Sequence, residues 1–121
     1  MGLLKIDHLR KILQIPSIRD QFLSKSIQIN ESLIQSLYID FELEMFRTIP
    51  SCSNVIPEVP EVMEYLRERE IKVGSTTGYT KKMLDVLSAI AKEQGYEPDA
   101  RVAADEVQKV RDRFRVIRAG F

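Results

Sequence analysis

The stretch IKVGSTTGYTKKMLDVLSAIAKEQG, residues 71–95, decides the expected fold. Its first seven residues have the length and composition of a β-strand, and Gly78 ends that strand. A helix follows, because Thr80 is suited to cap an N-terminus and Gly95 to stop a helix. The apolar stripe of this helix consists of Met83, Leu84, Leu87 and Ile90.

The residues on either side of this stretch extend the pattern. A short helix is expected over residues 60–70, with Val62, Tyr65 and Leu66 facing inward. A second short strand is expected over residues 100–104, ARVAA. From about residue 58 the order is therefore helix, strand, helix, strand, which predicts a parallel α/β layer.

The first fifty residues are expected to be helical throughout. An amphipathic helix over 3–14 is stopped by Pro16, and a second short helix starts at Ser17. Asn30 caps a third helix, which Pro50 ends. Apolar residues recur along that third helix at helical spacing, at Leu33, Leu37, Phe41, Met45 and Phe46.

Composition limits the classes of partner. The net charge is zero, so no overall field attracts nucleic acid or a membrane surface. The tail carries five basic residues (Lys109, Arg111, Arg113, Arg115 and Arg118), but a solvated helix face or frayed end explains them better than a nucleic-acid site. The single cysteine, Cys52, suits a reducing compartment. No signal peptide or membrane-spanning run is recognisable, so we expect a cytoplasmic protein.

Lys5 is the first residue whose position suggests a chemical role. On a helical projection it falls among apolar residues, between Leu9 and Ile12, and His8 lies three residues further on. A lysine among apolar groups loses hydration, which favours the neutral amine, and a neutral amine attacks carbonyl carbon to form a Schiff base. In the alternative, the stem covers apolar surface while the ammonium reaches water. Periodicity alone favours that alternative.

The second chemical feature is GSTTGYT, residues 74–80. Thr76 and Thr77 are expected at the carboxyl end of a parallel strand, the edge at which open α/β sheets bind ligands. The N–H groups of Gly78 and of the following helix start favour an anion, with phosphate as the obvious candidate. Serine and threonine clusters before helices are also ordinary caps, and this alternative stays open.

The opening MGLLKIDHLR and the segment 71–99 together closely resemble the phosphonoacetaldehyde hydrolase (phosphonatase) family of the haloacid dehalogenase superfamily, over roughly residues 1–107. The resemblance implies an α/β fold, with a helical cap-domain portion followed by a partial Rossmann-like parallel-sheet core. The implied boundaries are 1–52 for the cap portion, 53–107 for the partial core and 108–121 for a basic tail unlike the family. The implied activity is cleavage of a carbon–phosphorus bond to give acetaldehyde and phosphate.

The resemblance also implies roles for single residues. Lys5 matches the lysine that forms an imine with the aldehyde, and His8 matches its proton-handling neighbour. Thr77 matches the hydroxyl that hydrogen-bonds the transferring phosphoryl group. The other matched positions around the site are Met1, Gly2, Gly78 and Tyr79.

The chain departs from the family in ways that bear on activity. It contains no Asp-x-x-Gly-Thr segment for the nucleophile, and no Gly-Arg-Pro or later Gly-Asp segment. In the family the first and last of these segments supply the Mg²⁺ site and the Gly-Arg-Pro segment carries a basic phosphate-binding residue. We therefore expect the chain alone not to bind Mg²⁺ and to be an internal or truncated piece. Nothing marks Asp105 and Glu106 as substitutes.

Three functional hypotheses follow. The chain is a portion of a hydrolase acting on a small phosphonate, an inactive remnant serving as a phosphonate-binding or protein-interaction module, or a helical structural protein without a ligand. Without the family's first strand, the strand at 71–77 exposes an edge and an apolar face. We therefore expect a homo-oligomer, unless a tail helix containing Val110, Phe114 and Val116 covers that face.

Overall fold

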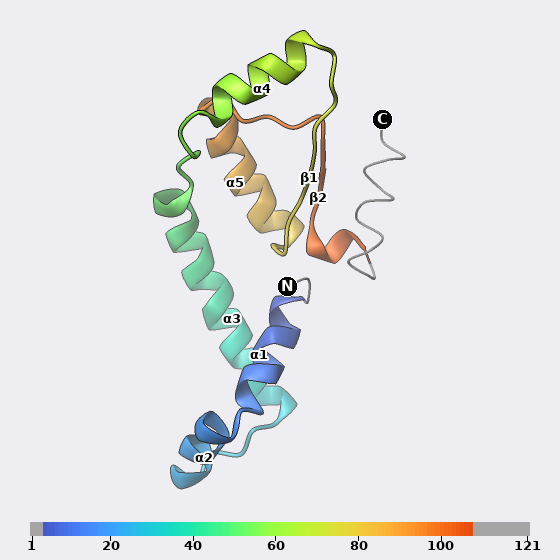
Figure 1. Cartoon of the computed structure of the whole chain (residues 1–121). Coiled ribbons are helices and arrows are strands. Elements are labelled where there is room, and N and C mark those ends of the chain that lie inside the picture. Colours follow the sequence, from blue (N-terminus) through green and yellow to red (C-terminus); the bar gives the residue numbers. More distant parts are fainter. Residues whose placement is uncertain (1–3, 108–121) are drawn as a thin grey trace.

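A computed structural model describes residues 4–107 of the chain. Short helices alternate with one long helix and two short strands along the chain (Figure 1). In chain order the elements are α1 (Lys5–Leu13), α2 (Pro16–Ser24), α3 (Glu31–Thr48), the 3₁₀ turn η1 (Ile49–Cys52), α4 (Val59–Glu68), β1 (Gly74–Thr76), α5 (Lys81–Glu93), β2 (Ala100–Val102) and the 3₁₀ turn η2 (Ala104–Glu106).

The helix boundaries follow from local chemistry. Asn30 Oδ1 accepts the Leu33 amide at 2.9 Å and begins α3, and Thr80 Oγ1 accepts the Met83 amide at 3.5 Å and begins α5, so both expected caps are confirmed. Beyond α5, Gly95 adopts φ +91°, and a Cβ there would lie 2.9 Å from Pro60 Cβ. Only glycine fits both constraints.

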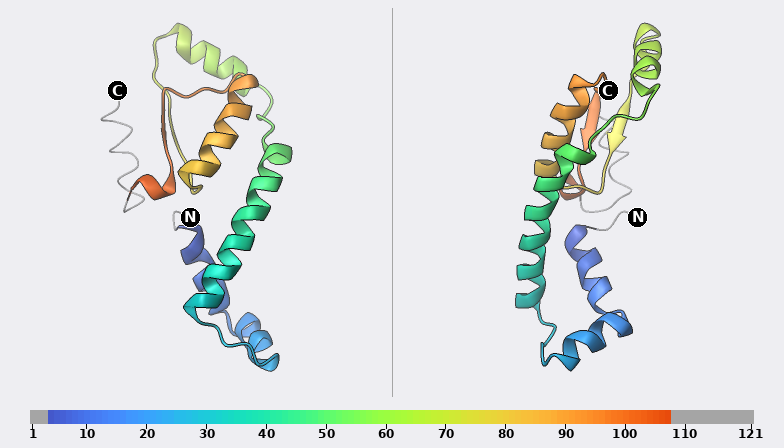
Figure 2. Two further views of the ribbon diagram at one scale, coloured as in Figure 1. Left: turned by 180° about the vertical axis from the view of Figure 1, so that it is seen from behind. Right: turned by 90° about the vertical axis from the view of Figure 1, so that its left-hand side faces the viewer.

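The two strands are parallel and hydrogen-bonded, with Ser75 opposite Arg101, and α5 connects them. The expected α/β pattern is therefore confirmed, although each strand is shorter than its composition predicted. A strand ends where its pairing ends, and each of these strands has one partner within residues 4–107. Figure 2 shows α5 running beside both strands, with the α1–α2 pair beyond one end of the sheet.

The buried core is small and centres on Met83, which is 0% exposed. The expectation for α4 was wrong in its details. Leu66 is half-buried as expected, but Met63 is the buried residue of this helix, and Val62 and Tyr65 are 53% and 54% exposed. Arg69 lies over the Tyr65 ring, 3.5 Å from its centroid, so the ring is covered by a guanidinium at the surface and not by the core.

The apolar repeat predicted for the third helix marks its less exposed side, which includes the half-buried Met45 and Phe46. Ile34 is its buried residue, while Leu33 and Leu37 are half-buried and Phe41 is 37% exposed. The most exposed apolar residues of this 18-residue helix, Ile39 and Leu43, lie off that repeat and lack a cover within the described residues. No helix among residues 4–107 has the length and apolar character needed to cross a membrane. The tail residues Val110, Phe114 and Val116 lie outside the described residues.

Candidate functional site

The N-terminal end of α1 approaches the sheet at the edge where β1 and β2 end (Figures 1 and 2). Lys5, the first residue of α1, is half-buried, and its ammonium lies over the Tyr79 ring, 5.4 Å from the centroid. Tyr79 belongs to the loop between β1 and α5. The helical and α/β regions of the chain therefore meet at these two residues.

Lys5 also lines an apolar cavity of about 180 Å³. The other walls are His8, Leu9 and Ile12 from α1 and Phe41 from α3. The sequence placed Lys5 between Leu9 and Ile12, and the structure places all three residues on the same cavity. His8, one turn along α1, faces the same space, so an imidazole and an amine border one pocket with hydrocarbon walls.

The loop after β1 is organised around Thr77. Thr77 Oγ1 accepts the Tyr79 amide at 3.2 Å, and the Thr77 amide donates to the Val102 carbonyl at 3.1 Å. These bonds fix the threonine at the carboxyl end of the sheet. Its hydroxyl group acts as an acceptor in the first bond, which leaves the hydroxyl hydrogen for a ligand oxygen.

Gly78, the next residue of this loop, has open space beside its backbone. Its amide donates to no acceptor within residues 4–107, and an added Cβ would meet nothing within 4 Å. Its φ is outside the left-handed region, so neither backbone geometry nor a neighbouring atom of the described chain requires glycine there. A half-buried amide beside a threonine hydroxyl is a suitable cradle for a phosphoryl oxygen.

The two acidic residues after β2 brace the same edge of the sheet. Asp105 Oδ1 accepts the Lys81 amide at 2.8 Å, and Glu106 Oε1 lies 3.5 Å from the Lys81 ammonium. Glu106 Oε2 also accepts the Ala103 amide at 2.8 Å. Both carboxylates therefore hold the start of α5 against the end of β2.

These residues do not fit a magnesium site. Mg²⁺ requires an octahedral set of oxygen ligands that includes carboxylates. Within residues 4–107 no group of three or more His, Cys, Asp or Glu residues is placed to hold a metal ion, and one oxygen each of Asp105 and Glu106 already accepts a backbone hydrogen bond.

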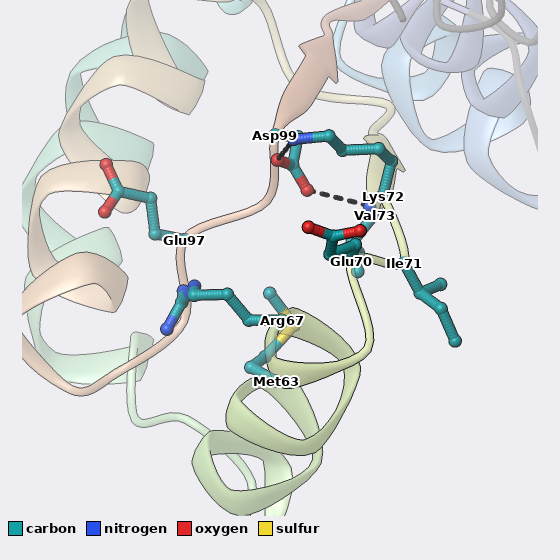
Figure 3. A pocket seen from close by; sticks show the side chains of 8 residues that line it. All are labelled: Met63, Arg67, Glu70, Ile71, Lys72, Val73, Glu97 and Asp99. Atoms are coloured by element: carbon teal, nitrogen blue, oxygen red, sulfur yellow. Dashed lines mark hydrogen bonds and ion pairs between the residues drawn. The ribbon is translucent and has the colours of Figure 1, made fainter.

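A second hollow lies at the opposite, amino-terminal end of the strands (Figure 3). There Asp99 Oδ2 accepts the Val73 amide at 2.9 Å and Asp99 Oδ1 lies 3.1 Å from the Lys72 ammonium. The amide bond first, and the ammonium second, hold the pKa of Asp99 below its usual range. This carboxylate ties the beginning of β1 to the turn before β2 and is remote in the sheet from Thr77.

The structure thus brings together Lys5, His8 and Tyr79 and links Tyr79 to Thr77 and Gly78. Met1 and Gly2, the other expected site residues, lie outside the described residues. Sequence reasoning did not include Phe41 in the site or foresee the contact between Lys5 and Tyr79. The only available signal for Phe41 was its place on the apolar repeat of the third helix.

No protein-family model matches the chain. Curated proteins named phosphonoacetaldehyde hydrolase do match, and those from Bacillus cytotoxicus and Bacillus cereus (strain G9842) are each 45% identical over 108 residues, 88% of this chain and 41% of theirs. The crystal structure of a phosphonoacetaldehyde hydrolase-like protein from Oleispira antarctica is similar at a TM-score of 0.90 and 34% identity, over 99% of this chain and 45% of that one.

The chain therefore spans less than half the length of these relatives. The resemblance expected from the sequence is confirmed. So is the fold class, with helices of a cap portion followed by a partial parallel-sheet core.

Proposed function

We propose that this chain, whose sequence and fold are related to phosphonoacetaldehyde hydrolases, carries the imine-forming and phosphoryl-binding portion of such an enzyme's site. One observation carries the proposal. The amine of Lys5 lies over the ring of a residue, Tyr79, whose amide is bonded to the hydroxyl of Thr77. A carbonyl-seeking amine and an anion-binding loop are thereby adjacent, and a small phosphonate with an aldehyde group needs both.

In the proposed reaction the neutral Lys5 amine adds to the aldehyde carbon, and uptake of one proton with loss of water leaves a protonated imine. Thr77 and the Gly78 amide hold oxygens of the phosphonate. When phosphorus is transferred, the electron pair of the carbon–phosphorus bond moves into the imine and gives an enamine. Protonation of that enamine carbon and hydrolysis release acetaldehyde and the free amine, with His8 as the proton carrier on the cavity wall.

The attack on phosphorus is the step that this chain does not supply by itself. It requires a nucleophile, and the sequence contains no Asp-x-x-Gly-Thr segment. In the proposal, the nucleophilic carboxylate and the magnesium site of the family come from residues other than those described. Release of phosphate from phosphonoacetaldehyde by the purified chain would contradict this assignment of the nucleophile to other residues.

Reductive trapping tests the imine directly. The chain is incubated with acetaldehyde and cyanoborohydride, and the ethylated lysine is mapped by peptide mass spectrometry. We expect preferential ethylation of Lys5 and loss of that product in Lys5→Ala. Lys11→Ala is the matched control, because Lys11 lies on the same helix but is exposed. Equal labelling of all lysines, or trapping unchanged by Lys5→Ala, would refute the imine role.

A second candidate function is binding without chemistry, and the amide of Gly78, which has no acceptor within residues 4–107, favours it specifically. In this case the chain binds phosphate or a phosphonate but does not react with aldehydes. Titration with inorganic phosphate, followed by the amide resonances of the loop, would then shift Gly78 while acetaldehyde trapping at Lys5 is absent. Observation of both effects supports the enzymatic proposal instead.

We also propose that the chain associates with itself. Large apolar side chains on α3 and α4 are well exposed, among them Ile39 at 56%, Leu43 at 62% and Val62 at 53%. Light scattering coupled to size-exclusion chromatography should give a mass above that of one chain. A monodisperse monomer that binds no hydrophobic dye would contradict the proposal.

A further inference from the structure

Lys5 has no acidic partner in the described part of the chain. No carboxylate of residues 4–107 forms an ion pair with its ammonium, and Asp7, two positions along the helix, faces another side. Asp7 instead pairs with Arg10 at 2.7 Å, and Arg10 also reaches Glu31 of α3 at 2.5 Å. The Tyr79 ring is therefore the group in the described chain that faces the Lys5 ammonium.

The backbone of Tyr79 is held by hydrogen bonds on two sides. The Tyr79 amide donates to Thr77 Oγ1 at 3.2 Å, and the Tyr79 carbonyl accepts the Ala104 amide at 2.8 Å. The point from which the ring projects is thus fixed relative to the anion-binding loop, whereas Lys5 has a long, flexible stem. The contact with the ring therefore holds the Lys5 amine near the loop.

We infer that the ring of Tyr79 is a positioning residue that holds the Lys5 nitrogen within reach of a phosphonate bound at Thr77 and Gly78. The inference rests on the proposed function and adds a role for the aromatic face. A cation is attracted to that face by the ring's quadrupole. Condensation of the amine and the aldehyde, with uptake of a proton and loss of water, gives a protonated imine. The nitrogen stays positively charged in this imine, so its contact with the ring persists.

The aromatic face, and not the hydroxyl group, is the feature of Tyr79 that this role needs. Within the described residues the Tyr79 hydroxyl takes part in no hydrogen bond, while the ring lies beneath the ammonium. Tyr79→Phe should therefore preserve the role and Tyr79→Leu should abolish it. Both substitutions leave the backbone bonds to Thr77 and Ala104 in place.

The test compares two aldehydes in the cyanoborohydride reaction, phosphonoacetaldehyde and acetaldehyde, with Lys5 labelling as the readout. The wild-type chain and Tyr79→Phe should label faster with the phosphonate, and Tyr79→Leu should reduce that advantage by about two- to five-fold, the range of a partly exposed cation–π contact. Acetaldehyde labelling should change less, because it does not need the amine near the loop.

Three results would overturn the inference. An undiminished phosphonate advantage in Tyr79→Leu, or an equal loss in Tyr79→Phe, would exclude the ring as the positioning group. Absence of Lys5 labelling in the wild-type chain would remove the proposed function and the inference together, so the two failures are distinguishable.

A measurement on the unsubstituted chain keeps the inference testable if Tyr79→Leu does not fold. The Lys5 ε-methylene protons, assigned with Lys5→Arg, should show an upfield ring-current shift. Shifts equal to those of the exposed Lys11 would contradict the contact.

Discussion

The ammonium of Lys5 lies 5.4 Å from the centre of the Tyr79 ring and thereby joins the first helix of the chain to the loop that follows β1. The two residues are separated by most of the chain, including the long helix α3. Their contact unites the helical region and the α/β region in a single candidate site, because every other expected site residue in the described region adjoins Lys5 or Tyr79.

Replacement of Gly78 by alanine should weaken phosphate binding without destabilising the fold. The added methyl meets no atom within 4 Å, and φ is outside the left-handed region, so the melting temperature should be nearly unchanged. The same methyl occupies the open space in which a phosphoryl oxygen would approach the amide, so phosphate affinity should fall by about tenfold or more, as for one lost charge-assisted hydrogen bond.

Thermal unfolding and a phosphate titration of the Gly78→Ala variant check the two halves of this prediction. Unchanged phosphate affinity, together with normal folding, would mean that the anion does not bind against Gly78.

Asn30→Ala should destabilise the helical region of the chain. Asn30 Oδ1 accepts the Leu33 amide at 2.9 Å, and its removal leaves an N-terminal donor of α3 without that partner. The expected loss is about 1 kcal/mol in the free energy of unfolding, measured by urea denaturation. Asn30→Asp should retain the stability, and Ser36→Ala, an exposed change within α3, should have little effect. Equal stability of Asn30→Ala and Ser36→Ala would contradict the capping role.

The pairing of Asp99 predicts a specific pH dependence. The Val73 amide and the Lys72 ammonium lower the pKa of Asp99 in the folded chain, so its carboxylate stabilises the fold above the unfolded pKa of about 3.9. That contribution should be lost as the pH falls through the lower, folded pKa. Asp99→Asn should therefore be less stable than the wild type at neutral pH, with a difference that shrinks on acidification.

Urea unfolding of both chains from neutral pH to acid pH measures this difference. Glu64→Gln, at an exposed position of α4, is the control and should show no such trend. A gap between wild type and Asp99→Asn that stays constant with pH would rule out the proposed linkage.

Local chemistry made much of the fold predictable. Asn30 and Thr80 were expected as caps and are caps, because an N-cap depends on one side chain and an amide three residues away. The order of helix, strand, helix and strand was predictable for the same reason. Each element has its own periodicity and its own terminating residue.

Burial was less predictable because it depends on what covers each face. Val62 and Tyr65 lie at helical spacing, yet Met63 is the buried residue, since α4 contacts the described region of the chain through only one narrow face. Periodicity shows that an apolar face exists and does not show whether another element packs against it.

The candidate site was predictable in its residues and unpredictable in its contacts. Helical spacing placed Lys5 beside Leu9 and Ile12, and the strand-to-helix turn placed Thr77 and Gly78 at the carboxyl end of the sheet. The approach of Lys5 to Tyr79 depends on the relative position of α1 and the sheet, which is set by packing between residues far apart in the chain. No local pattern encodes that distance.

The central claim is that the Lys5 amine and the Thr77–Gly78 loop act on one molecule. The most direct test is the rate of cyanoborohydride labelling of Lys5 by phosphonoacetaldehyde relative to acetaldehyde, in the wild-type chain and in Thr77→Val. We expect faster labelling by the phosphonate in the wild type, and loss of that advantage in Thr77→Val with acetaldehyde labelling retained. Equal rates for the two aldehydes in the wild type, or the same advantage in Thr77→Val, would contradict it.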